Sequence, residues 1–174
     1  MARTTPHTRT LMAACASVAL AVLTAGCTQG SSAGSPSPVP PSGRPTGTPG
    51  RAHVEGPGVD LTVTDAVAHL DRSGDGSLSM RVKSDDDAPE HLGMVATTEG
   101  GRGVLVGAKS AEGSGSLTTA GILVLSGTTV TFGGSGPRIL LHHVHGVTAE
   151  HTLPLILQFG LAGMVRVQAR VTSS

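Results

Sequence analysis

The sequence predicts an all-β domain with the architecture of a Greek-key β-sandwich, and three observations support this class. Apolar and polar residues alternate in short runs, most clearly over residues 163–171. Glycine, serine and aspartate separate these runs at intervals of roughly 8 to 12 residues, as in sandwich folds. Beyond residue 52 no long stretch has the period of an amphipathic helix. Together these features favour antiparallel strands joined by tight turns.

Each expected strand has its own signature. Residues 153–159 place Leu153, Leu155, Leu157 and Phe159 on one face, with Pro154 near the strand start, where a missing N–H is tolerated. Residues 71–78 include an Asp-Gly step, which predicts a hairpin turn. The expected strands cover residues 59–70, 77–82, 91–97, 103–108, 122–125, 128–132, 138–145, 153–159 and 163–171.

The N-terminus has the pattern of a bacterial lipoprotein signal peptide. Basic residues precede an apolar run over 11–23, which is too short to span a bilayer as a helix, and the run ends in Leu-Thr-Ala-Gly-Cys27. In such precursors the thiol of the cysteine receives a diacylglyceryl group, and the cysteine becomes the new N-terminus. We therefore expect residues 1–26 to be removed, and Cys27 to anchor the chain by lipid at the extracytoplasmic face of the cell membrane.

Composition divides the rest of the chain in two. Residues 27–52 are rich in Ser, Gly, Pro and Thr and predict a disordered tether, whereas residues 53–174 have the size of one domain with a hydrophobic core. All twelve acidic residues lie in this domain with eight basic ones, a net charge of −4 with neutral His. No basic patch favours a nucleic acid partner, and two phenylalanines as the only aromatic residues disfavour carbohydrate binding.

The C-terminal half carries a succession of turns and strands that resembles one known family. A small-residue turn and strand over 117–132 lead to a Gly-rich turn at 133–136 and a strand beginning at Arg138. An apolar strand ending in Phe159 and an Ala-Gly turn then enter the final valine-rich strand. This order is similar to that of the extracytoplasmic copper chaperones called PCuAC. The resemblance covers most of residues 57–171 and implies a cupredoxin-like β-sandwich that carries Cu(I), so copper is the cofactor to test.

By the count from the Gly-rich turn, all the copper ligands that the resemblance implies are missing, whereas the count back from Gly146 keeps at most one nitrogen ligand and no thioether. In that family a His-x-Met pair lies on the metal strand, where side chains two apart point to one side. Counted from the Gly-rich turn, these positions fall on Arg138 and Leu140; counted back from Gly146, they fall on Leu141 and His143. The family's other His and Met have no counterpart, since no His lies between 92 and 141 and no Met between 95 and 163. The charge of Arg138 would repel a copper cation.

Three histidines, His142, His143 and His145, follow this strand and offer a substitute. If the strand continues, His143 and His145 project from one side at a Cα separation of about 7 Å and form a chelating pair for Cu(II), Ni(II) or Zn(II). A third ligand would come from His151 or Glu150. The alternative is that the three histidines are exposed to solvent at the end of the strand, before the Gly146 turn.

Two functional classes follow from these residues. The first is a lipid-anchored protein with a copper-chaperone-like domain that acts in copper handling. The second is a metal-free, lipid-anchored interaction module on the same fold, with an unknown protein partner. We expect no enzymatic activity, because no Gly-x-Ser-x-Gly elbow in a strand-turn-helix setting accompanies the Ser, His and Asp residues.

His91 and Met94, in the expected strand over 91–97, are residue types that bind soft metals. Strict alternation places them on opposite sides of the strand, so Met94 is expected to pack in the core.

Overall fold

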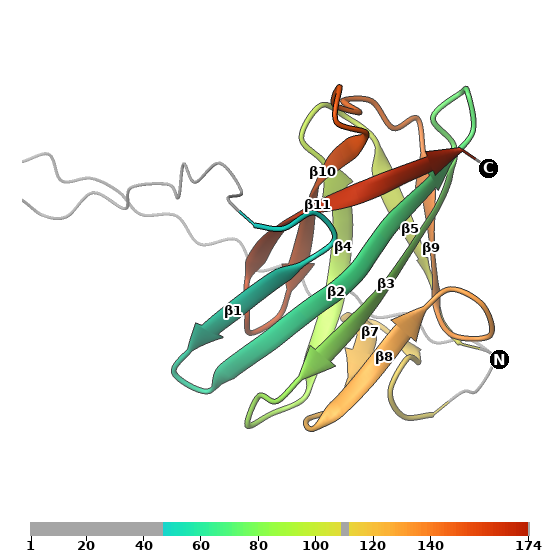
Figure 1. Cartoon of the computed structure of the whole chain (residues 1–174). Helices are drawn as coiled ribbons and strands as arrows, with labels where there is room; N and C mark the ends of the chain where they lie inside the picture. The colour runs from blue at the N-terminus through green and yellow to red at the C-terminus, as the bar shows by residue number, and fades with distance from the viewer. Residues whose placement is uncertain (1–46, 109–111, 174) are drawn as a thin grey trace, which may run out of the picture. The chain divides into compact units, whose positions relative to one another are not determined.

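A computed structural model of the chain describes residues 47–108 and 112–173, in which strands and turns alternate and no helix occurs (Figure 1). No helix of this described part is long and apolar enough to cross a membrane. The expected signal peptide, Cys27 and most of the tether lie outside the described residues. The strands are β1 (Ala52–Gly56), β2 (Val59–Leu70), β3 (Gly76–Ser84), β4 (Glu90–Thr97), β5 (Arg102–Val106), β6 (Leu117–Thr118), β7 (Gly121–Val124), β8 (Thr128–Phe132), β9 (Arg138–His142), β10 (Thr152–Phe159) and β11 (Met164–Ser173).

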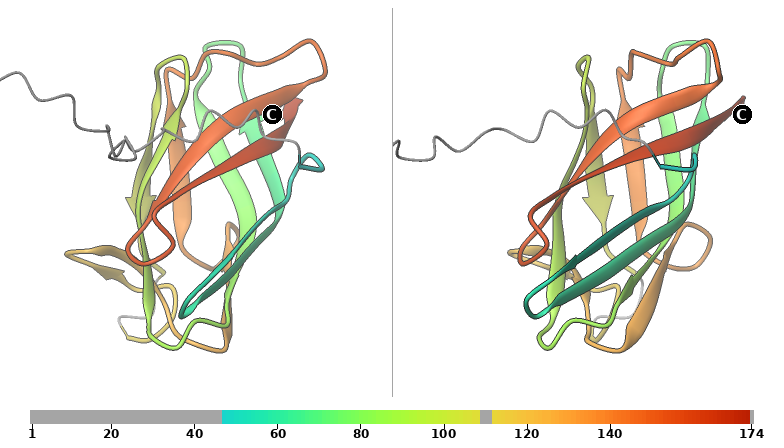
Figure 2. Two further views of the ribbon diagram at one scale, coloured as in Figure 1. Left: turned by 90° about the vertical axis from the view of Figure 1, so that its left-hand side faces the viewer. Right: turned by 60° about the vertical axis from the view of Figure 1, so that its left-hand side comes forward.

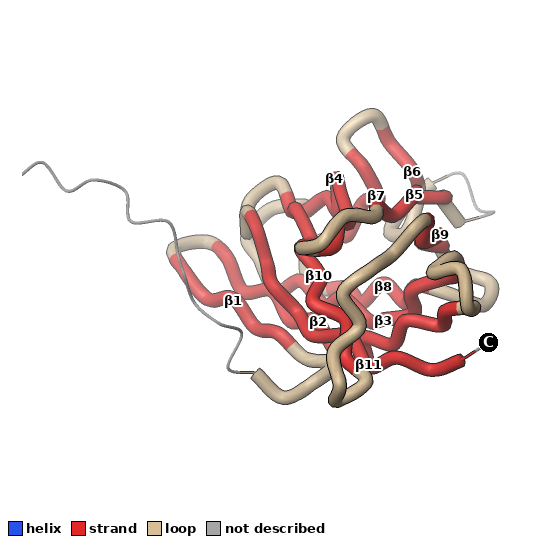
Figure 3. Tube along the Cα trace, turned by 90° about the horizontal axis from the view of Figure 1, so that it is seen from above, coloured by secondary structure: helices blue, strands red, loops and turns tan. Residues whose placement is uncertain are grey.

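The strands pair in a continuous order that closes on itself. The order is β1-β2-β11-β10-β4-β5-β9-β3-β8, and β2 also pairs with β3, so the strands from β2 to β3 along this path form a barrel (Figures 1 and 3). Most pairs are antiparallel, but β11 runs parallel to β2. Two further views show β10 and β11 crossing the barrel obliquely to β9 (Figure 2). The all-β class expected from the alternating pattern is confirmed.

The barrel encloses one apolar core built from the inward positions of nearly every strand. Leu61, Leu92, Ile139 and Leu155 are completely or almost completely buried. Phe132 is also buried and is the largest of the side chains that are less than 2% exposed. Because side chains alternate along a strand, burying one face leaves the neighbouring positions on the outside of the barrel. The outward positions are therefore available for ligands and partners.

Some boundaries differ from those that the sequence predicts. The expected strand over 138–145 ends at His142. The structure adds β1, which pairs with β2, and the short β6, which pairs with β7. Neither strand is long or regular enough to produce a strand pattern in the sequence. Strand β1 begins at Ala52, the last residue of the expected tether.

The end of β9 lies against the β2–β3 hairpin turn at residues 71–75. Gly74 has a φ of 82°, and a Cβ atom there would lie 2.4 Å from the carbonyl oxygen of Val144. Only glycine fits this combination of left-handed backbone and close approach. The carbonyl of Gly74 accepts a hydrogen bond from the N–H of Val144 at 3.0 Å. This bond fixes residues 142–145, the histidine segment, on the turn.

Candidate functional site

The histidine segment begins where Asp75 interrupts strand β9. The carboxylate Oδ1 of Asp75 accepts a hydrogen bond from the backbone N–H of His143 at 2.9 Å, and the Nδ1 of His142 lies 3.8 Å from the same oxygen. His143 has a left-handed backbone with a φ of 51°, which turns the chain out of the strand. The turn of β2 and β3 therefore determines where β9 ends.

This geometry corrects the expected pairing of His143 with His145. The prediction required a continuous strand, in which both side chains would share the side of Ile139 and Leu141. Those two residues are buried in the core, whereas both histidines are exposed, and Val144 between them is buried instead. His142, in contrast, shares the outer side of β9 with Arg138 and the half-buried Leu140.

The structure distributes the histidines over two separate clefts. One cleft, of about 610 Å³, is lined by His142 and His143 together with Gly101, Arg102 and Val104. The other, of about 650 Å³, contains His145 and also His151, a third ligand considered from the sequence. Within residues 47–108 and 112–173, no group of three or more His, Cys, Asp or Glu side chains is arranged to hold a metal ion. Binding of a metal by His142, His143 or His145 stays a prediction.

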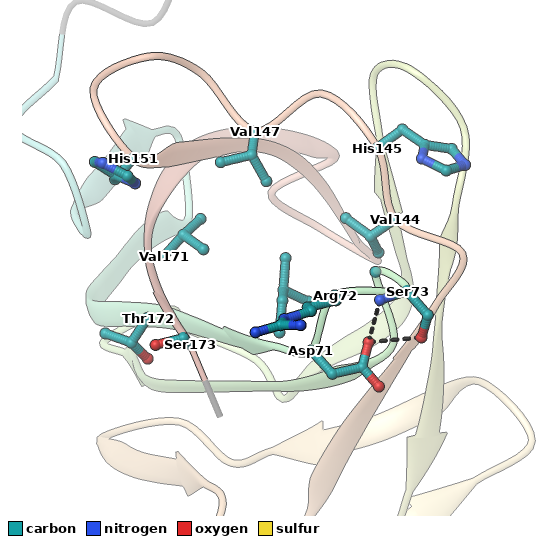
Figure 4. Close-up of a pocket in the computed structure, with 12 residues that line it drawn as sticks. Asp71, Arg72, Ser73, Val144, His145, Val147, His151, Val171, Thr172 and Ser173 are labelled. Atoms are coloured by element: carbon teal, nitrogen blue, oxygen red, sulfur yellow. Dashed lines mark hydrogen bonds between the residues drawn. The ribbon is translucent and has the colours of Figure 1, made fainter.

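The cleft with His145 has a mixed lining of apolar, polar and charged side chains. Val147 and Val171 line it, and the side chain of Arg72 reaches in from the β2–β3 turn (Figure 4). The ring of His145 points outward at the rim, and His151 lies at the other side of the opening (Figure 4). The lining thus combines the guanidinium of Arg72 with the carboxylate of Asp71 and two imidazoles.

The carboxylate of Asp71, at the edge of this cleft, is already engaged. Its Oδ1 accepts hydrogen bonds from the Oγ and the backbone N–H of Ser73, at 2.6 and 2.8 Å, and from the N–H of Asp75 at 3.1 Å. The hydroxyl of Ser73 and then the N–H of Asp75 lower the pKa of Asp71 below its ordinary value. The segment that begins at Asp71 is therefore a hydrogen-bonded hairpin turn, as the Asp-Gly step in residues 71–78 predicts.

The two positions that the count from the Gly-rich turn assigns to the His-x-Met pair present no copper donor. Arg138 is exposed on the outer side of β9 and lies opposite Val106 of β5, and Leu140 lies opposite Val104. A guanidinium carries a permanent charge and a leucine has no lone pair. No sulfur or imidazole thus projects from these two positions.

A β-bulge in β4 changes the side to which Met94 points. Gln158 of β10 pairs with Met94, but the next residue, Phe159, pairs with Leu92, so Gly93 is an extra residue. Met94 is 42% exposed instead of packed in the core, and the expectation of core packing is wrong. A bulge shifts the alternation by one position and leaves no periodic trace in the sequence. His91 and Met94 consequently lie on the same outer side of β4.

Glu90, at the start of β4, has a buried carboxylate whose role the sequence pattern does not reveal. Its side chain is completely buried and its two carboxylate oxygens accept hydrogen bonds from four backbone N–H groups, those of His91, Gly160, Leu161 and Ala162, at 2.6 to 3.0 Å. The last three donors form the turn between β10 and β11. Glu90 thus fixes this turn to β4, and it acts on the structure of the adjacent outer face.

Comparison with known proteins places the fold. No protein-family model matches the sequence, and no curated protein matches it. Among solved structures, the copper-bound PCuAC domain from PmoF2 matches with a TM-score of 0.52 and 18% identity, over 71% of this chain and 98% of that domain. The apo PCuAC domain from PmoF1 matches with a TM-score of 0.55 and 20% identity, over 71% of this chain and 100% of that domain.

A third structure, the apo PCuAC domain of PmoF2, matches with a TM-score of 0.52 and 15% identity, over 70% of this chain and 95% of that domain. Identities this low establish the arrangement of the strands and do not transfer ligands. The resemblance inferred from the sequence is therefore confirmed at the level of the fold: the described domain has the cupredoxin-like fold of PCuAC domains.

Proposed function

We propose that this chain is a lipoprotein, anchored through Cys27 at the extracytoplasmic face of the cell membrane, whose PCuAC-fold domain takes part in copper handling. The observation that carries the copper assignment is the fold, which is shared along nearly the full length of a copper-bound domain. The lipobox over residues 23–27 supports the anchor. The proposal assigns no catalytic step to the domain.

Deletion of the gene in its own host tests the copper assignment. A role in copper handling predicts altered copper content in the deletion strain and slower growth under copper depletion, both restored by the wild-type gene. Unchanged copper content and unchanged growth across a series of copper concentrations would contradict the assignment.

The anchor has a separate test. The Cys27→Ala variant cannot be lipidated, so we expect it to leave the membrane fraction, whereas the wild-type chain should be found there with a lipid-modified N-terminal cysteine by mass spectrometry. A C27A variant that stays in the membrane fraction would contradict anchoring at this residue.

The histidine segment provides the first candidate for metal ligands. His142 and His143 line one cleft, and imidazole suits Cu(II) and Zn(II). Against them, Arg102 lines the same cleft, and its fixed positive charge opposes a cation. Isothermal titration with Cu(II) and Zn(II) should lose its signal when His142, His143 and His145 are replaced by Ala. The matched control is His53→Ala, an exposed histidine that hydrogen-bonds to Thr62 on β2.

A second candidate function is a metal-free interaction module on the same anchor. It is favoured by the donor-free positions Arg138 and Leu140 and by the cleft that holds the guanidinium of Arg72 above apolar side chains. Such a cleft suits a partner that presents a carboxylate next to an apolar group. Metal analysis of protein purified without chelators from its own host distinguishes the two functions, because the module predicts no stoichiometric copper.

A further inference from the structure

Two exposed methionines lie in one cross-strand row on the outside of the barrel. Met94 of β4 pairs with Gln158 of β10, and Gln158 pairs with Met164 of β11. Successive strands are about 4.8 Å apart, so the Cα atoms of the two methionines are separated by about 10 Å. Both side chains therefore flank Gln158 on the same face of the sheet.

Their exposure is unusual for methionine and differs from that of the third methionine in the described residues. Among residues 47–108 and 112–173 there is one other methionine, Met80, and only 2% of its surface is exposed. Met94 is 42% exposed and Met164 is 69% exposed. Methionine is commonly buried, since its side chain is apolar and fills gaps in cores. Core packing thus does not account for this pair.

A histidine stands beside the same row. His91 lies on the outer side of β4, because the bulge at Gly93 brings it into phase with Met94. His91 and Gln158 line one small hollow together with Gly93 and Gly160. An imidazole and two thioethers are therefore placed around a single glutamine side chain.

The buried carboxylate of Glu90 holds this arrangement in place from below. It accepts the N–H of His91 at 2.6 Å and the N–H groups of the turn that leads into Met164. A ligand set on strands that are fixed in this way needs little reorganisation when a metal binds. The flexible thioether arms, with three rotatable bonds each, supply the final adjustment over Gln158.

We propose that His91, Met94 and Met164 form a binding site for a soft monovalent metal ion, Cu(I) in the cell and Ag(I) as its laboratory equivalent. Thioether sulfur is the protein ligand that favours Cu(I), and imidazole completes such a donor set. The site lies on the outer face of β4, β10 and β11, and Leu140 of β9 is two strands from Met94 on the same face. This inference deepens the proposed role in copper handling, since it names the residues that would hold the ion.

Methyl NMR of the methionines tests the site directly. The experiment uses residues 41–174, which form one compact unit and contain the whole apolar core, labelled with ¹³C at the methionine methyl groups. Silver(I) should shift the signals of Met94 and Met164 in a saturable way, while the buried Met80 serves as an internal reference and keeps its signal. Unmoved signals of Met94 and Met164 at stoichiometric silver would overturn the proposal.

Variants define which residues bind. Met94→Leu combined with Met164→Leu keeps the volume and removes both sulfur atoms, and we expect Cu(I) affinity in competition with bicinchoninate to fall at least about tenfold, the lower end of what even second-shell changes cost at metal sites. His91→Asn should act in the same direction. The matched control, His53→Ala, replaces an exposed histidine that hydrogen-bonds to Thr62 and should leave Cu(I) affinity unchanged. Equal affinity of wild-type and M94L/M164L protein would overturn the site, and a circular dichroism spectrum verifies folding.

The outcomes separate the site from the cellular function. If silver shifts the signals of Met94 and Met164 but the deletion strain has normal copper content, the site is supported and the role in copper handling is contradicted. Altered copper content in that strain, together with Cu(I) binding that survives M94L/M164L, would support copper handling and overturn this site.

Discussion

Replacing Glu90 by glutamine should destabilise the domain by about 2 to 3 kcal/mol, although the change removes no heavy atom. Oε1 accepts three N–H groups and Oε2 accepts two, so the new amide nitrogen will take the position of Oε2. There the N–H of Ala162 loses its acceptor and faces another donor, while Leu161 keeps its contact to Oε1 at 3.0 Å. A hydrogen bond to a charged group contributes about 1.5 to 3 kcal/mol, which sets the magnitude.

Urea unfolding of residues 41–174, followed by circular dichroism, measures this loss. With an m-value of about 2 kcal/mol per molar urea, the midpoint should fall by about 1 to 1.5 M in Glu90→Gln. Glu55→Gln is the matched control, because the Glu55 side chain is 81% exposed and its replacement should change stability by less than about 0.5 kcal/mol. Equal midpoints for the two variants would refute the conclusion that Glu90 holds the β10–β11 turn.

Three further changes test other parts of the structure. Gly76→Ala places a Cβ atom 1.8 Å from the carbonyl oxygen of His69 and should cost about 2 to 4 kcal/mol in thermal melts, whereas Gly56→Ala meets no atom within 4 Å and should be neutral; similar melts would contradict the hairpin geometry. Hydrogen bonds lower the folded pKa of Asp71, so its contribution to stability is present above the unfolded value near 3.9 and disappears as pH falls through the lowered folded value; Asp71→Asn should therefore shrink the difference in urea midpoint between pH 7 and pH 3. Arg138→His combined with Leu140→Met should gain Cu(I) binding in competition assays, and affinity equal to wild type would contradict the placement of the metal strand.

The fold was largely predictable because burial dictates a period of two. Strands such as β8 and β10 have inward apolar residues at every second position, and the alternating pattern located them within a residue of their observed ends. Strand β1 was missed, because its pairing with β2 depends on a partner in space, and its five residues contain a single valine. Short edge strands of this kind have no pattern of their own.

The candidate sites were less predictable, because they depend on backbone irregularities. The sequence predicted one strand over residues 138–145 that includes three histidines, but the hydrogen bond from His143 to Asp75, 68 positions away, ends the strand at His142 and separates their side chains. Likewise, the bulge at Gly93 moves Met94 to the outer face. In both cases one long-range contact or one inserted residue overrides the local alternation, and the alternation was the basis of the prediction.

Arg138 and Leu140 illustrate how outward positions on a strand differ from inward ones. Both residues point outward, whereas the intervening Ile139 is completely buried in the core. Folding constrains the inward positions, since a polar or undersized residue there costs several kcal/mol, but outward positions on a strand change with little effect on stability. Donor positions on the outer face of a barrel are therefore independent of its architecture. The same independence allows donors on another strand set, such as Met94 and Met164, without any change in the core.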